Sequence, residues 1–237
     1  PTMTTSAPTS RCATAPPERV TSGRGAALWL LLGALAAGPA GADCRDLAAP
    51  RAVPTAAEGQ WNLATFNLWR LRDTEKNSPI DRPLDDAVYQ ARLDALAGYI
   101  VDTLKAPVLL AVQEVENLAI LEQLAERVTA RGGPRYRARL LEGHDPAGMD
   151  VALLHRAPAE VGGVRALFAD QRFRNQPLFS RPPLAVSLTA PRELTLVIVH
   201  LRSANGLGEK PWVAEKRRRQ AARLAEWSRA HSDTALA

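Results

Sequence analysis

Cysteine and aromatic residues are scarce in this sequence. Its two cysteines, Cys12 and Cys44, have no partners at the spacing of zinc ligands, which excludes a structural zinc site and a framework of several disulfides. Aromatic residues make up 5% of the 237 residues, against 46% hydrophobic and 23% charged residues. These proportions are typical of a globular protein, and the length suffices for one large domain with a sizeable core.

A long hydrophobic run is also lacking. The apolar segment at residues 26–37 is too short for a transmembrane helix, which needs about 20 residues. Arg19 and Arg24 precede it, and the small residues 40–42 follow it. This succession is typical of a secretory signal peptide. We therefore predict that residues 1–42 are cleaved off and that the protein is secreted, or periplasmic in a bacterium.

Two other interpretations of the N-terminus remain open. The apolar segment could stay uncleaved as a signal anchor. Cys44 could instead carry a lipid, although Asp43 directly before it is a poor match to the small residue of a lipoprotein signal. Apart from such an anchor, the sequence indicates no contact with a membrane.

The charge balance has no acidic excess. Lys and Arg number 30 against 25 Asp and Glu, a formal net charge of +5, which suits a polyanionic partner such as nucleic acid. A basic run at residues 216–219 is followed by Arg223 and Arg229. It is typical either of a solvated helix face or of a surface that contacts nucleic acid. No feature indicates a stable protein partner, so we expect a monomer with nucleic acid as its substrate.

The periodicity of apolar residues divides the remaining chain into a linker, residues 43–60, and a domain, residues 61–237. Helical and strand-like spacings predict the secondary structure of this domain. The expected helices cover about residues 89–104, 118–130 and 211–231, and the expected strands residues 61–68, 108–112, 136–141, 150–155, 163–168, 184–188 and 194–201. This order predicts a mixed α/β (α+β) fold with packed sheets, and a helix layer over each of two sheets would make a four-layer α-β-β-α sandwich.

Two polar residues stand out on the first predicted strands, where core packing does not call for them. Asn67 lies on an apolar strand, and a buried amide there needs a partner, which could be no more than a turn. Glu114 follows the most apolar strand, where a carboxylate is costly to bury unless it meets a cation or hydrogen-bond donors. The alternative for Glu114 is an exposed acid at a helix N-terminus.

Two further polar residues occur beside later strands. Arg181 lies before the strand predicted at 184–188, and His200 closes the apolar run 196–199. Taken alone, Arg181 is equally well a solvated loop residue, and His200 a hydrogen-bonded core residue rather than a catalytic one.

In combination these residues belong to segments that resemble one family. The segments are TFNLW, LLAVQEVEN, GMDVALLHR, FSRPPLA and VIVHLRSANG. In this order they look like successive motifs of the endonuclease/exonuclease/phosphatase superfamily, which has the deoxyribonuclease-I-like fold. The resemblance covers about residues 60–231, and it is greatest to the bacterial extracellular nuclease-like branch. Gln113-Glu114 and His200-Leu201 are its more specific elements.

The resemblance implies a divalent metal site at Asn67 and Glu114, which match the asparagine and glutamate that hold the metal in the family. We expect Mg²⁺, with Mn²⁺ or Ca²⁺ as alternatives. Mg²⁺ usually takes only one or two protein carboxylates, together with water and phosphate oxygens. It would polarise a phosphodiester and stabilise the charge on the leaving oxygen.

The resemblance also implies roles for three other residues. Arg181 matches an arginine that contacts the substrate phosphate, which suits the guanidinium fork. His200 matches a histidine that hydrogen-bonds the scissile phosphate and stabilises its transition state. Asn67, Glu114 and His200 are thus the predicted catalytic residues, and Arg181, Asn67 and His200 the predicted phosphate-binding ones. Asp150 matches a recurrent acid of the family and receives no assigned role.

The later motifs of the family are absent from this sequence. In the family, a Gly-Asp-x-Asn strand end and a terminal Ser-Asp-His supply the groups that orient the phosphate and the general base. Here Ser232-Asp233 follows His231, which is the wrong order. We therefore expect a domain that is incomplete at the C-terminus and lacks its last strands. Loss of a general base alone would lower a rate by roughly 10² to 10⁴.

The implied function is a metal-dependent phosphodiester hydrolase, most simply a secreted nuclease that acts on DNA or RNA. Two alternatives remain open. The same residues could serve a phosphodiesterase or phosphatase for lipid or small phosphate esters, such as sphingomyelin or inositol phosphates, or the chain could be a fragment without activity. The loops at 69–88 and 202–212 show no pattern that selects a substrate.

Overall fold

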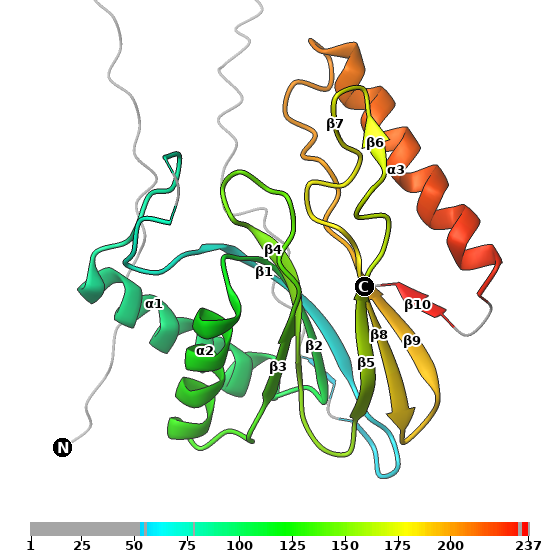
Figure 1. Ribbon diagram of the computed structural model, residues 1–237. Helices are drawn as coiled ribbons and strands as arrows, with labels where there is room; N and C mark the ends of the chain where they lie inside the picture. The colour runs from blue at the N-terminus through cyan, green and yellow to red at the C-terminus, as the bar shows by residue number, and fades with distance from the viewer. Residues whose placement is uncertain (1–52, 55, 78, 232–233, 237) are drawn as a thin grey trace, which may run out of the picture. The chain divides into compact units, whose positions relative to one another are not determined.

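Two four-stranded β-sheets form the centre of the protein in a computed structural model, which describes residues 53–54, 56–77, 79–231 and 234–236 (Figure 1). The signal peptide predicted at residues 1–42 and the first part of the predicted linker lie outside these residues. No helix in the described ranges combines the length and apolar character needed to cross a membrane.

The first sheet contains the strands from the first half of the domain, in the order β1-β2-β4-β3. Its strands are β1 (Leu63–Leu71), β2 (Leu109–Val115), β3 (Arg137–Leu140) and β4 (Asp150–His155). β1 and β2 run parallel, whereas β4 is antiparallel to both β2 and β3. The parallel pair needs a crossover, and the helix at residues 86–98 lies within it.

The second sheet follows in the chain and has the order β10-β9-β8-β5. Its strands are β5 (Glu160–Ala166), β8 (Leu184–Ala190), β9 (Leu194–Ile198) and β10 (Thr234–Leu236). β5, β8 and β9 are antiparallel neighbours, whereas β10 pairs parallel to β9. A two-stranded hairpin of β6 (Arg172–Phe173) and β7 (Gln176–Pro177) lies between β5 and β8 in the chain.

Helices cover the outer faces of both sheets, which makes four layers (Figure 1). The first layer contains α1 (Asp86–Gly98), the π-helical segment η2 (Tyr99–Thr103) and α2 (Leu118–Ala130), and the last contains α3 (Pro211–Arg229). The side chain of Asn117 caps α2 by accepting the N–H of Ile120 at 2.9 Å, which satisfies one of the free donors of the first turn. The predicted α-β-β-α sandwich is confirmed.

Alternating side chains of the strands supply the three hydrophobic layers between these four. Leu110 and Val112 of β2 pack under α1 and α2, whereas Leu109 and Ala111 face the second sheet. In the second sheet, Val186 points toward the first sheet and its neighbour Ala185 packs under α3. This two-residue period buries both faces of each sheet, and it explains why β2 reads as a continuous apolar run.

Several boundaries differ from the predicted ones. The strand predicted at 194–201 ends at Ile198, and the helix predicted through residue 104 gives way to η2 after Gly98. β6, β7 and β10 were not predicted, because two or three residues carry no readable periodicity. β10 adds a strand to the second sheet after α3, where the sequence had led us to expect none.

Candidate functional site

Both β1 and β2 are irregular where their polar residues lie. The register of β1 against β2 breaks after Asn67 and resumes at Leu71, and that of β2 against β4 breaks between Gln113 and Val115. Glu114 is the residue left over in β2, and its φ of 62° lies in the left-handed region. Such a bulge bends the strand and redirects a side chain. It turns Glu114 out of the regular alternation of β2.

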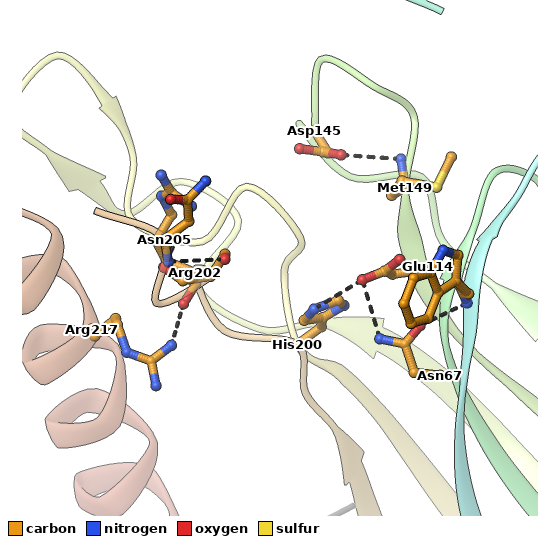
Figure 2. A network of polar contacts seen from close by, with 10 residues as sticks. Asn67, Glu114, Asp145, Met149, His200, Arg202, Asn205 and Arg217 are labelled. Carbon is orange, nitrogen blue, oxygen red and sulfur yellow. Dashed lines mark hydrogen bonds and ion pairs between the residues drawn. The ribbon is translucent and has the colours of Figure 1, made fainter. Parts of the chain in front are cut away.

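Asn67, Glu114 and His200 come together beside these bulges (Figure 2). Asn67 Nδ2 donates a hydrogen bond to Glu114 Oε1 at 3.1 Å. His200 Nε2 lies 3.6 Å from the same oxygen. Asn67 comes from β1, Glu114 from β2 and His200 from the segment after β9, so both sheets contribute to the site.

The backbone that follows Asn67 is held in an unusual conformation. Trp69 and Arg70 have φ values of 54° and 56°. Asn67 Oδ1 accepts the N–H of Trp69 at 2.8 Å, and the guanidinium of Arg92 on α1 donates to the carbonyl oxygens of Leu68, at 2.7 Å, and of Trp69. These contacts fix a turn that exposes 81% of the Trp69 side chain next to the site.

His200 is buried enough to remain neutral at neutral pH. Burial and the nearby Arg181 guanidinium lower the pKa of His200, and the opposite effects of Glu114 and Asp145 are smaller. A neutral imidazole has one N–H donor and one acceptor nitrogen. Nδ1 of His200 is buried and has no hydrogen-bond partner in the described part of the chain, and Nε2 lies 3.6 Å from Glu114 Oε1, so no described group fixes which ring nitrogen carries the proton.

Arg181 lies three residues before β8 and faces several groups of the site. Its positive charge lowers the pKa values of His200, Asp150 and Lys216. Its Nε is buried and forms no hydrogen bond to any described residue. A buried N–H group without a partner is costly, and an anion such as phosphate would satisfy it.

Asp150 begins β4 and is only 3% exposed. Burial raises the pKa of Asp150 to about 7, helped by Glu142 and Asp145 and opposed by a hydrogen bond from the Gly143 N–H and by Arg181. The loop at Gly143 passes so close that a Cβ atom there would lie 2.4 Å from Asp150 Oδ1. The structure thus places this predicted site residue beneath the loop and near Arg181, without a role that its geometry defines.

Asp145 is a site residue that the sequence did not reveal. Its charge acts on the pKa values of both His200 and Asp150, and Figure 2 shows it above Glu114 and His200. Met149 N donates to Asp145 Oδ2 at 3.3 Å, and His144 N donates to the Ser180 carbonyl at 2.7 Å. These bonds hold the loop against the segment that carries Arg181. The glycines and the proline of this loop are typical of an ordinary turn, so nothing in the sequence singled out Asp145.

Glu114 has the chemistry of a ligand for a hard divalent cation. Its Oε1 faces Asn67 and His200, whereas Oε2 has no partner within the described residues. Asn67 turns its amide nitrogen toward Glu114 and commits its oxygen to Trp69, so it orients Glu114 more directly than it offers a ligand of its own. No group of three or more His, Cys, Asp or Glu in the described ranges could hold a metal ion, but Mg²⁺ needs only one or two protein carboxylates.

Solved structures with a similar course of the chain exist, although no family model and no curated protein matches. Humanized D. rerio TDP2 matches with a TM-score of 0.48 and 16% identity over 73% of this chain and 57% of its own. TDP2 from Caenorhabditis elegans matches with 0.36 and 18% identity over 50% and 32%. ANGEL2, a 2',3'-cyclic phosphatase, matches with 0.40 and 15% identity over 60% and 41%.

TDP2 and ANGEL2 are members of the endonuclease/exonuclease/phosphatase superfamily. This is the superfamily that the motifs of the present sequence resemble. The present chain spans from about a third to somewhat over half of the length of these structures. Similarity at this level concerns the course of the backbone, so a function has to be argued from the side chains.

Proposed function

We propose that this chain is a phosphodiester hydrolase whose site binds a divalent metal ion and a phosphate group. The observation that carries the proposal is the convergence of Asn67 of β1, Glu114 of β2 and His200 of the segment after β9. The backbone of Glu114 lies in the left-handed region, with a φ of 62°, and such strain persists mainly where a functional site requires it.

Each side chain has a defined part in this proposal. Glu114 would hold a divalent cation through Oε2, and Asn67 would keep Glu114 oriented through its bond to Oε1. The cation, Mg²⁺ or Mn²⁺, would supply charge neutralisation at a phosphate oxygen. Arg181 Nε and the neutral His200 ring provide donors for the remaining phosphate oxygens, since both contain a buried nitrogen without a described partner.

We further propose nucleic acid as the substrate and export as the destination. The net charge of +5 supports a polyanionic substrate. Trp69 is 81% exposed beside Asn67, and aromatic side chains at such sites can stack on unpaired bases. Secretion rests on the pattern of residues 1–42 alone.

Hydrolysis and metal binding should be measured separately. The substrates are bis(p-nitrophenyl) phosphate and a fluorescent single-stranded oligonucleotide, with Mg²⁺, with Mn²⁺ and with EDTA. Mn²⁺ binding is followed by electron paramagnetic resonance in the wild type, in Glu114→Gln, and in Glu122→Gln as a control with an exposed acid on α2. We expect wild type and Glu122→Gln to bind Mn²⁺ alike, and Glu114→Gln to lose this binding.

The rate of hydrolysis should depend on the bound metal ion. EDTA and Glu114→Gln should each reduce hydrolysis by about 100-fold or more. Mn²⁺ binding without hydrolysis would show that the cation site is intact but that the group which activates water is missing. Equal Mn²⁺ binding by Glu114→Gln, or hydrolysis that survives EDTA, would contradict the proposal.

A further inference from the structure

Lys216 is a buried lysine that lacks a partner of opposite charge. The buried face of α3 consists of Val213, Lys216, Gln220 and Leu224, at spacings of three and four residues that fall on one side of a helix. Lys216 is only 2% exposed, and no described residue forms a hydrogen bond or ion pair with it. An ammonium group with so little exposed surface and no such partner is unfavourable, so its position calls for a ligand.

Gln220 shows where the side chain of Lys216 lies. Gln220 Oε1 accepts the N–H of Arg202 at 3.0 Å, and Gln220 Nε2 donates to the Leu178 carbonyl at 2.9 Å. Gln220 therefore joins the segment before Arg181 to the segment after His200. Lys216 precedes Gln220 by one helical turn on the same face, so it lies beside the same two segments.

The surroundings of Lys216 are cationic. Burial lowers the pKa of Lys216, and the charges of Arg202 and Arg181 lower it further, with no carboxylate to oppose them. Glu215, its neighbour in the chain, pairs instead with Arg174 at 3.3 Å and with Arg219 at 2.9 Å. Three like charges in one place are unfavourable unless an anion lies among them.

Lys216, Arg202 and Arg181 form a cationic cluster, and its position relative to the candidate site identifies the anion. Arg202 follows His200 by two residues, and Arg217 donates to the Arg202 carbonyl from α3 (Figure 2). Arg202 also lies over the Trp212 ring, with 5.4 Å between Cζ and the ring centroid. The cluster is therefore next to the place where His200 and Arg181 would receive a phosphate.

We propose that Lys216 and Arg202, with Arg181 shared between the two, form a second phosphate site, which binds the phosphate adjacent to the one received at His200. This inference rests on the proposed function and names its substrate class: a phosphodiester with a second phosphate group close by. The second group has two chemical sources, the next phosphodiester of a polymer or a terminal phosphate monoester. Both present the oxygens that guanidinium and ammonium groups bind.

The test compares ligands with one and with two phosphates under conditions without turnover. The affinities of d(TpT), d(pTpT) and d(TpTpT) are measured by isothermal titration calorimetry in EDTA. The variants are Lys216→Met, which keeps the length of the side chain, and Arg218→Met, which removes an equal charge from the exposed face of α3. We expect wild type and Arg218→Met to bind at least one two-phosphate ligand about tenfold more tightly than d(TpT).

Lys216→Met should bind all three ligands with the affinity of d(TpT). A preference for d(pTpT) alone would identify a terminal phosphate, and an equal preference for d(TpTpT) would identify a polymer. If Lys216→Met keeps the wild-type preference, or if the wild type has none, the second phosphate site is wrong. Because EDTA removes the metal, this outcome is independent of whether the chain hydrolyses phosphodiesters.

A thermal measurement separates ligand binding from a packing role. Without phosphate, Lys216→Met should melt at a higher temperature than the wild type, because it removes a buried charge without a partner. Inorganic pyrophosphate should raise the melting temperature of the wild type and of Arg218→Met, and raise that of Lys216→Met much less. A Lys216→Met variant that melts lower and responds fully to pyrophosphate would assign Lys216 to packing alone.

Discussion

Glu114 combines a charged side chain with a backbone conformation that disfavours side chains. Its φ is 62°, whereas the residues on either side continue the pairing of β2. For a residue with a Cβ atom the left-handed region costs on the order of 1 kcal/mol. The cost is local, and the gain is a carboxylate that meets Asn67 and His200 instead of the core.

Two substitutions that both remove the carboxylate measure this cost. Glu114→Gly should be about 1 kcal/mol more stable than Glu114→Ala, because glycine adopts a positive φ without strain. Gln113 has no such backbone and serves as the control. At position 113, the glycine variant should be less stable than the alanine variant. Urea unfolding of the four variants gives the comparison, and the same order at both positions would refute the strained backbone.

Asp150 should make stability depend on pH. Its pKa is raised from 3.8 to about 7, so between these values the folded protein keeps a proton that the unfolded chain has released. The stabilisation is full below pH 4 and is lost as the pH rises through 7, by an amount on the order of 4 kcal/mol. In Asp150→Asn this loss should disappear.

Urea unfolding in EDTA at pH 5 and at pH 8 tests this dependence. The difference between the two pH values should be smaller in Asp150→Asn than in the wild type. Asp170→Asn, which removes an exposed carboxylate, should behave as the wild type does. Equal losses in wild type and Asp150→Asn would show that Asp150 is ionised at both pH values.

At the scale of the elements, α3 covers the second sheet and also binds the segments that carry Arg181 and Arg202. Val213 and Leu224 anchor the helix, and Gln220 between them binds the segments of Arg181 and Arg202. The basic run at 216–219 therefore has two faces. Lys216 points inward, whereas Arg218 and Arg219 are exposed.

Gln220→Leu should loosen this connection. The substitution leaves the Leu178 carbonyl and the Arg202 N–H without partners in a buried place, which costs about 2 kcal/mol or more. Chemical denaturation measures the change, and Arg218→Met should alter stability by less than about 0.5 kcal/mol. A loss equally small for Gln220→Leu would mean that these two bonds do not fix α3.

The sequence predicts long, strongly periodic elements better than irregular ones. α2 matches the predicted helix at 118–130 and β4 the predicted strand at 150–155, because their apolar patterns are uniform. The bulge at Glu114 was not predictable, since a bulge depends on the partner strand. Lys216 was hidden in a run of four basic residues, although its spacing from Val213 and Gln220 already placed it on the buried face.

On the scale of the whole molecule, a protein with a net charge of +5 that binds nucleic acid should bind it less tightly as the salt concentration rises. Three phosphate contacts to a single strand, from Arg181, Arg202 and Lys216, predict a slope of log affinity against log salt of about −2. Lys216→Met should reduce its size by about 0.7, and Arg218→Met should not. Fluorescence anisotropy at several NaCl concentrations measures the slopes, and a wild-type slope near zero would exclude these contacts.

The order of the predicted helices and strands indicated the four layers, and the motifs indicated the candidate residues. The structure brings Asn67, Glu114 and His200 close together. It does not give Asp150 a direct bond to them, and it places the charge of Asp145 near His200. Asp145 acts on His200 through charge, from a segment far away in the chain. Local sequence patterns contain no information on such distances.

The two sheets are built from consecutive halves of the domain, so the ribosome makes the two parts of the site one after the other. All strands of the first sheet, with Asn67 and Glu114, have been synthesised once residue 155 has been added. Arg181, His200 and Lys216 follow over the next 61 residues. Since translation adds roughly 5–20 residues per second, the nascent chain contains Glu114 for several seconds before the last of the cationic residues of the site has been added.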